Sequence, residues 1–280
     1  MSTPRFSIVT ITFNAADALR RTLESVNAQT FAGVEQIVVD GGSTDGSVEV
    51  IARCGRRVAW WVSEPDAGIA DAFNKATRQA SGDYICYLNA GDVFAAHDVL
   101  ERVAARIGHQ TSMEPTIYFG DFVSSHEGVQ RLHHASAALE DFAWDNPINH
   151  QSAFVPRSLA QAQPYDVRLT LGMDYDFWLR AMKTARFEQV PGPIAIFELG
   201  GRSSASAWVV HSLIIHRTLW HVNRGSRLGA GDWVGIATRA IRLKLKLGVR
   251  RLLGRRLAGA IRAAKSRRLT RLQASAPTPA

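Results

Sequence analysis

Two loops in the first hundred residues place a carboxylate beside glycine directly after a short apolar run. Asp40-Gly41-Gly42 combines a side chain that can accept a hydrogen bond from a flat heterocyclic N–H with two residues that let a ligand approach the backbone. Asn89-Ala90-Gly91-Asp92 offers one carboxylate, which suits a hard divalent cation that fills its other positions with substrate phosphates and water. A purely structural role explains each loop about equally well. Asp40 could belong to an ordinary turn and cap the following helix, and Asp92 could cap a helix that begins at the next residue.

Two further segments concentrate acids. Residues 63–76 (SEPDAGIADAFNKA) contain three acids, among them Asp66 and Asp71, which is unusual for a loop that only connects two elements. Both side chains could contact ribose or sugar hydroxyls, or they could be solvated loop residues. Asp174 and Asp176 open a helical pattern, where acids usually cap the helix and interact with its dipole. An ionised carboxylate there could also receive a proton from an alcohol during a displacement.

The loops belong to an alternating pattern of strands and helices. Apolar runs predict strands at Phe6–Phe13, Gln36–Asp40, Val58–Val62 and Tyr84–Leu88, and helical spacing predicts helices at Ala15–Ala28, Ser47–Arg53, Ala70–Ala80 and Asp98–Arg106. This alternation predicts an α/β fold with a parallel sheet covered on both faces. Because ligands bind such sheets at the carboxyl ends of the strands, the acidic loops should meet at one edge.

The pattern weakens in the second half of the chain. After a strand at Ile117–Phe122, residues 121–150 show no clear period. A strand is expected at His150–Pro156, a helix at Met173–Lys183 and a short strand at Ile194–Glu198. Two basic, mainly helical segments then follow a stretch rich in glycine and serine.

Charge is distributed very unevenly. The chain of 280 residues carries a formal net charge of +8, but residues 1–200 hold 16 Lys and Arg against 24 Asp and Glu. Residues 201–280 hold 17 Lys and Arg and one acid, Asp232. An acidic body therefore precedes a strongly basic tail, and the two require separate explanations.

Several classes of protein are disfavoured. An apolar content of 46% argues against a wholly disordered chain. The dinucleotide fingerprint G-x-G-x-x-G and the P-loop signature are absent. The sequence has only two cysteines, lacks a signal-peptide pattern and lacks an apolar stretch of about 20 residues. These features favour a cytoplasmic protein that does not span a membrane.

The ordered set of segments is more specific than any one of them. The segments are SIVTITFN, VDGGSTDGS, SEPDAGIADAFNKA, SGDYICYLNAGD, HQSAFVPR and GMDYDFWLR. Together they resemble the family 2 glycosyltransferases of the GT-A fold, over residues 5–200. The likeness is closest to bacterial members that build surface polysaccharides. It implies a GT-A domain over residues 1–200, with a mainly parallel, Rossmann-like sheet and helices on both faces. A basic helical membrane-surface extension at 201–272 and a disordered tail at 273–280 would follow.

The resemblance also implies residue roles for the donor. Thr12, Phe13 and Asp40 would hold the nucleotide base, usually uracil, while Asp66 and Asp71 would lie near the nucleotide-sugar. These roles are carried over from the family pattern.

Two acids and a histidine would serve the chemistry. Asp92 matches the last acid of the family's D-x-D type motif and would ligate Mn2+ or Mg2+ on the diphosphate. Asp174 resembles the general base that deprotonates the acceptor hydroxyl, with inversion at the anomeric carbon. His150 stands in a family-like HQ-x-x-F context and could approach the diphosphate or the metal; a structural histidine is at least as compatible.

The sequence departs from the family pattern at two places. Asn89 and Gly91 stand where many relatives have acids, so Asp92 is the one sure carboxylate ligand of the loop. Met173 replaces the usual glutamate beside Asp174. The Q-x-x-R-W signature of processive synthases is absent, which favours the addition of one sugar at a time.

The basic tail indicates a location. From Trp233 to Leu272, apolar residues alternate with Arg and Lys, and Val234, Ile241 and Leu245 recur at helical spacing. Basic helices of this kind lie in membrane interfaces, where each Lys or Arg contributes about 1 kcal/mol at an anionic surface. The alternatives are a helix packed on the acidic body and a nucleic-acid arm, but the tail carries no recognised reading motif.

Our main hypothesis is therefore a peripheral enzyme on the cytoplasmic, inner face of the cell membrane. It would move a single sugar from a nucleotide-sugar, UDP-linked, to a saccharide or lipid-linked saccharide acceptor in polysaccharide biosynthesis, with no nucleic-acid partner. The alternative is a non-catalytic module that binds nucleotide-sugar or polysaccharide. An RNA-binding protein, a third possibility, would show RNA affinity that depends steeply on salt.

Overall fold

The computed structural model describes residues 5–109, 114–126, 128–198 and 206–252 of the chain. Contacts divide the chain into two compact units, residues 1–227 and residues 228–280. The sequence-based domain boundary after residue 200 and the expected tail at 273–280 both lie outside the described residues.

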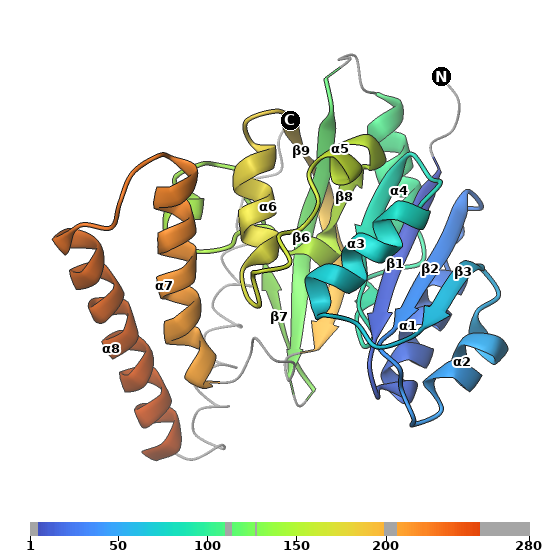
Figure 1. Ribbon diagram of the computed structural model, residues 1–280, viewed down its shortest axis with the longest axis horizontal. Coiled ribbons are helices and arrows are strands. Elements are labelled where there is room, and N and C mark those ends of the chain that lie inside the picture. Colours follow the sequence, from blue (N-terminus) through green and yellow to red (C-terminus); the bar gives the residue numbers. More distant parts are fainter. Residues whose placement is uncertain (1–4, 110–113, 127, 199–205, 253–280) are drawn as a thin grey trace, which may run out of the picture. The chain divides into compact units, whose positions relative to one another are not determined.

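Parallel strands form the first half of the sheet (Figure 1). The strands β1 (Phe6–Thr12), β2 (Val34–Asp40), β3 (Val58–Ser63) and β4 (Tyr84–Tyr87) lie in the order β3-β2-β1-β4. They alternate along the chain with the helices α1 (Ala16–Asn27), α2 (Ser47–Cys54) and α3 (Ile69–Gln79). The predicted α/β alternation is thus confirmed, with bounds that differ from expectation by one or two residues.

Side chains of one strand point alternately to the two faces of the sheet, and each face is covered by helices. Ile37 and Val39 of β2 belong to the same core cluster as Phe73 of α3. Val38, between them, packs in another cluster with Leu23 of α1 and residues of α2. The consecutive residues Ile37, Val38 and Val39 are therefore apolar because both faces of the strand are buried there.

The second half of the sheet is mixed. Strands β5 (Val93–Phe94), β6 (Thr116–His126), β7 (Val129–His133), β8 (Ala153–Pro156) and β9 (Arg186–Glu198) extend the order to β3-β2-β1-β4-β8-β6-β9-β5, and β7 pairs with β6. Strand β8 runs antiparallel to both β4 and β6, whereas β9 is parallel to β6. The helices α4 (Val99–Gly108), α5 (Arg157–Ala162) and α6 (Met173–Ala181) complete this part.

Three details differ from the sequence-based expectation. His150–Ser152 forms a 3-10 turn, so the strand predicted from His150 begins at Ala153. Strand β9 starts at Arg186, well before Ile194, and Arg102 donates to the carbonyls of Pro191 and Pro193 where the strand is irregular. Strand β7 lies in the region without a readable period, because most of its side chains are exposed and impose no alternation.

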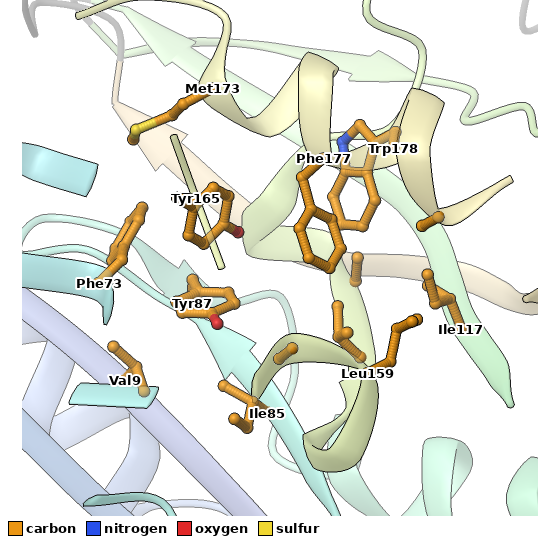
Figure 2. Packing of buried hydrophobic residues seen from close by; sticks show 14 of the residues in the cluster. Val9, Phe73, Ile85, Tyr87, Ile117, Leu159, Tyr165, Met173, Phe177 and Trp178 are labelled. Carbon is orange, nitrogen blue, oxygen red and sulfur yellow. The ribbon is translucent and has the colours of Figure 1, made fainter. Parts of the chain in front are cut away.

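The largest core cluster fixes α6 on the sheet (Figure 2). Phe177 and Trp178 point from α6 into an aromatic cluster with Tyr165 and Tyr87. Trp178 is fully buried, and its Nε1 donates to the carbonyl of Ile148 at 3.0 Å. This packing determines where the first turn of α6 meets the edge of the sheet.

Two further helices follow. Helix α7 (Ser206–Asn223) belongs to the first unit and packs against α6. Helix α8 (Ala230–Leu252) belongs to the second, and Trp233, Val234 and Ile241 are exposed on it. Within the described parts of the chain, no helix is both long enough and apolar enough to cross a membrane.

Candidate active site

The first part of the site lies where β1 and β2 end side by side. Thr12 and Asp40 are paired in the register of these strands. Asp40 is fully buried and accepts hydrogen bonds from the Ser43 amide at 2.9 Å and the Ser63 hydroxyl at 2.5 Å. Asp40 therefore forms a turn with Ser43 and does not cap α2; the Asp45 carboxylate accepts from the first residue of that helix, Ser47.

Phe13, Gly41 and Asp66 gather beside this turn. A Cβ on Gly41 would lie 3.1 Å from Asp66 Oδ2 and 3.2 Å from Phe13 Cδ2, so both side chains flank the bare glycine backbone. The Phe13 ring is 63% exposed and offers an apolar face. Thr12 Oγ1 is buried and has no hydrogen-bond partner among the described residues. The arrangement suits a flat ring that needs both stacking and polar contacts.

Asp71 lies at the start of α3. Its carboxylate accepts from the Ala67 amide at 3.2 Å and pairs with Lys75 at 3.4 Å, and Lys75 also pairs with Glu64 at 2.9 Å. The hydrogen bond to Glu64 and the charge of Asp71 raise the pKa of Lys75. Asp71 is thus partly neutralised by a lysine that sequence reasoning did not single out.

Asn14 joins the loops after β1 and β2. It adopts a positive φ of 47°, its amide donates to Ser43 Oγ at 2.7 Å, and its side-chain oxygen accepts from the Thr44 amide at 2.9 Å. Asparagine is common in turns, which the sequence shows, but the partners of Asn14 lie about 30 residues further along the chain. Asn14 therefore holds two candidate donor-binding loops together.

Asp92 follows β4 and precedes β5, so a helix-capping role for it is wrong. It is only 6% exposed, and its Oδ2 accepts from Gln151 Nε2 at 2.8 Å. Burial raises the pKa of Asp92 to about 6, against the opposing effect of the Gln151 hydrogen bond. Nearby, Asn89 Nδ2 lies 3.1 Å from His150 Nε2, and Asn89 Oδ1 is buried without a partner among the described residues.

Asp174 occupies the first turn of α6, after Gly172 in the left-handed region. Its Oδ2 accepts from Asn146 Nδ2 at 2.8 Å and lies 3.5 Å from His150 Nδ1. Burial raises the pKa of Asp174. The hydrogen bond and charge of His150, together with the charge of His216, lower it by more, so the pKa is lowered overall. Asp174 is consequently ionised at neutral pH.

The predicted site residues form two groups within one unit. Asp92, His150 and Asp174 are connected through Asn89 and the 3-10 turn that carries His150 and Gln151. The second group surrounds Gly41 and consists of Thr12, Phe13, Asp40 and Asp66. Asp71 lies on the next helix and is paired with Lys75. Sequence reasoning missed Asn14, Asn146, Gln151 and His216, since their partners are distant in the chain.

Oxygen atoms near Asp92 could bind a divalent ion together with a substrate. Among the described residues, no group of three His, Cys, Asp or Glu side chains could hold a metal ion unaided. The Asp92 carboxylate and the unpartnered Asn89 Oδ1 are hard oxygen donors in one loop. One or two protein oxygens, completed by substrate phosphates and water, are a common arrangement for Mg2+. The residues therefore fit an ion that arrives with a diphosphate.

Comparison with known proteins identifies the family of the chain. The model of the family described as Glycosyl transferase family 2 matches residues 7–157. An uncharacterized glycosyltransferase of Mycobacterium tuberculosis (strain H37Rv) is 35% identical over 184 residues, which cover 64% of this chain and 70% of that protein. A PGL/p-HBAD biosynthesis glycosyltransferase of Mycobacterium bovis (BCG Pasteur) is 32% identical over 186 residues, with the same coverage.

Solved structures share the fold at low sequence identity. Residues 1–349 of Staphylococcus aureus TarS in complex with UDP-GlcNAc match with a TM-score of 0.62 and 15% identity, covering 86% of this chain and 73% of that one. The mannosyltransferase PcManGT of Pyrobaculum calidifontis, in complex with GDP-Man and Mn2+, matches with a TM-score of 0.63 and 17% identity, covering 95% and 80%. The expected GT-A fold is confirmed, and the chain belongs to glycosyl transferase family 2.

Proposed function

We propose that this glycosyltransferase moves a single sugar, with inversion, from a nucleotide-sugar to a saccharide acceptor. The observation that carries the proposal is the connection between two acids of different character. Asp92 is buried with a raised pKa, Asp174 has a lowered pKa, and Asn89 and His150 link them. Acids in separate environments suit separate roles at one reaction centre.

Asp174 is the general base of this mechanism. Its two side-chain partners both contact Oδ2, so we assign Oδ1 to the acceptor hydroxyl. The acceptor oxygen forms a bond to the anomeric carbon while the bond from that carbon to the diphosphate oxygen breaks. The hydroxyl proton passes to Asp174, and the nucleoside diphosphate leaves with the electron pair. A single displacement of this kind inverts the anomeric configuration.

Asp92 and Asn89 would hold Mn2+ or Mg2+ together with the diphosphate. A bound divalent ion supplies Lewis-acid stabilisation of the charge that develops on the leaving group. Gln151 holds Asp92 Oδ2 and thereby orients the carboxylate, while the second oxygen of Asp92 is the proposed ligand. The Mn2+ bound with GDP-Man in the P. calidifontis mannosyltransferase supports this role.

The loops after β1 and β2 would bind the nucleotide. Phe13 offers a ring face, Thr12 an unpartnered hydroxyl, and Asp66 an exposed carboxylate beside Gly41. Asp40 supports the base-binding turn through Ser43 and Ser63. Asp71, on α3, would lie near the nucleotide-sugar. UDP-GlcNAc in S. aureus TarS favours a UDP-linked donor.

One experiment tests the function directly. The full-length protein is incubated with Mn2+ and a panel of UDP- and GDP-linked sugars, with and without saccharide acceptors, and nucleoside diphosphate release is measured. NMR of the product reports the anomeric configuration. We expect one donor to dominate and the configuration to be inverted. Retention of configuration would refute single displacement, and donor binding without any turnover would favour the non-catalytic binding module.

We also propose that the acceptor is lipid-linked and that α8 holds the enzyme at an anionic membrane surface. Trp233, Val234 and Ile241 are 52%, 66% and 58% exposed, so the helix presents apolar side chains to its surroundings. The tail around them carries 17 basic residues and one acid. Apolar residues beside a large cationic excess are typical of helices that lie in the interface.

The membrane proposal is tested by co-sedimentation with phosphatidylglycerol vesicles. Val234→Glu and Ile241→Glu should each weaken binding, and binding should fall with added salt because the charge attraction is screened. Val129→Glu, at a similarly exposed site on β7, is the matched control. If all three variants bind the vesicles as strongly as the unaltered protein, α8 does not contribute to membrane binding.

A further inference from the structure

Helix α7 packs against α6, the helix that carries the proposed base Asp174, and both helices lie beyond the segment matched by the family model, which ends at residue 157. Gly172, immediately before α6, has a φ of +71° and leaves room for this contact. A Cβ there would lie 3.1 Å from Ile215 Cγ2 and 3.3 Å from His216 Cδ2. The close approach brings α7 to the turn that carries Asp174.

His216 contacts the same turn through an aromatic ring. Its imidazole stacks on Tyr175 with ring centroids 4.4 Å apart and an interplanar angle of 23°. Burial lowers the pKa of His216, although the charges of Asp174 and Asp145 oppose this. The ring is therefore mainly neutral at pH 7 and acts as a flat packing surface beside the residue that follows the base.

Arg217, the next residue, contacts residues 143 and 144, which lead to Asn146, a partner of Asp174. Its Nη1 donates to the Ala143 carbonyl at 2.8 Å, and its guanidinium carbon lies 4.3 Å from the centre of the Trp144 ring. Tyr175 also donates its hydroxyl to the carbonyl of Phe142 in this segment. Residues 142–144 are thus tied to both α6 and α7.

Asn146 transmits this anchoring to Asp174. Its Nδ2 donates to Asp174 Oδ2 at 2.8 Å, while its Oδ1 is buried without a partner among the described residues. The side-chain amide of Asn146 cannot be flipped, because the flip would place its oxygen next to the Asp174 carboxylate. The hydrogen bond therefore depends on where residues 143–146 are held.

We propose that His216 and Arg217 of α7 are positioning residues of the catalytic centre: His216 holds the first turn of α6, and Arg217 holds the segment that presents Asn146 to Asp174. The proposal rests on the proposed function, in which Asp174 is the base. It adds α7 to the elements that hold the reaction centre. A small displacement of a base costs turnover more than it costs donor binding.

The kinetic test compares Arg217 of α7 with Arg224, which directly follows the last residue of that helix. Arg224 lies 5.0 Å from the Trp220 ring centre, a contact of the same kind as that of Arg217 with Trp144. Arg217→Met should lower kcat for sugar transfer by about tenfold or more and leave the donor KM nearly unchanged. Arg224→Met, the matched control, should keep kcat within about twofold. Equal kcat in the two variants would overturn the role of Arg217.

The ring of His216 is tested by a pair of substitutions. His216→Ala removes the stacked ring and should lower kcat, whereas His216→Phe retains a ring on Tyr175 and should recover most of it. An equal loss in both variants would contradict positioning by stacking. Thermal unfolding of each variant shows that it is folded at the assay temperature.

A second measurement does not require turnover. In the unaltered protein, the Asn146 side-chain amide signals, identified by their loss in Asn146→Ser, should exchange slowly with water because of the bond to Asp174. Exchange should be about tenfold faster in Arg217→Met and unchanged in Arg224→Met. If the protein transfers no sugar, the proposed function fails, and this exchange still decides whether Arg217 positions Asn146. Unchanged exchange in Arg217→Met would overturn the inference.

Discussion

The Nδ1 atom of His150 lies 3.5 Å from the Oδ2 atom of Asp174, on the side of the imidazole opposite Asn89. One histidine thus faces both the loop of the proposed metal ligand and the proposed base. Because the imidazole can stabilise a negative charge on either side, it favours ionised Asp174 and Asp92.

Loss of the base should abolish transfer without loss of the fold. Asp174→Asn removes the proton acceptor and should lower kcat by about 10²- to 10⁴-fold. Asp166→Asn is the control, since Asp166 pairs with Arg168 in the preceding segment and also carries one charge. It should leave kcat within about twofold. Near-normal turnover of Asp174→Asn would identify another residue as the base.

Loss of His150 should change the pH dependence of transfer. His150 lowers the pKa of Asp174 against the effect of burial, so His150→Phe should raise that pKa. The charge of His150 also lowers the pKa of Asp92, so the acidic limb of the kcat/KM profile, where these carboxylates become protonated, should then move to higher pH. His134→Phe removes a histidine that lies 2.9 Å from Asp121, away from the site, and should leave the limb in place. A limb that stays fixed in His150→Phe would contradict the coupling.

Metal dependence should follow the state of Asp92. The pKa of this carboxyl is raised to about 6, and only the ionised form binds a cation, so Mn2+ affinity should fall as the pH drops through about 6. EDTA should stop transfer, and added Mn2+ should restore it. Asp92→Asn should require far more Mn2+, unlike Asp98→Asn, an exposed aspartate paired with Arg102. Full activity in excess EDTA would refute metal use.

The bare backbone at Gly41 should matter for donor binding. A methyl group there would meet Asp66 and Phe13 at 3.1 and 3.2 Å, so Gly41→Ala must displace one of them. We expect the donor Kd to rise by about fivefold or more, measured by calorimetry, which corresponds to roughly 1 kcal/mol. Gly108→Ala adds a methyl group where nothing lies within 4 Å and should not change the Kd. Equal affinities would place the nucleotide elsewhere.

The cluster beneath α6 should dominate stability. Trp178 is fully buried and hydrogen-bonded to Ile148, so Trp178→Ala should lower the free energy of unfolding by about 3–5 kcal/mol in urea denaturation. Trp61 is 44% exposed, and Trp61→Ala should cost clearly less. Similar losses in the two variants would show that α6 is not anchored by this cluster.

Much of the fold was predictable because it depends on local signals. Buried strands such as Phe6–Thr12 are rich in β-branched and apolar residues, and helices such as Ala16–Asn27 show apolar residues at helical spacing. The hairpin strand Val129–His133 was missed because exposed side chains leave no period, and the turn at His150 was read as strand because its apolar neighbours continue into β8.

Local patterns in the sequence pick out the acids of the candidate site, and the family resemblance adds Thr12, Phe13 and His150. The positions of Asp40, Asp92 and Asp174 after strands or at a helix start follow from the sequence alone, because loop composition and periodicity are properties of neighbouring residues. The fold, in contrast, brings Asn146 and His150 to Asp174 from 28 and 24 residues away and stacks His216 of α7 on the neighbouring Tyr175. Burial and partners of this kind set the pKa of a carboxylate, and both arise from contacts between distant segments that no local pattern encodes.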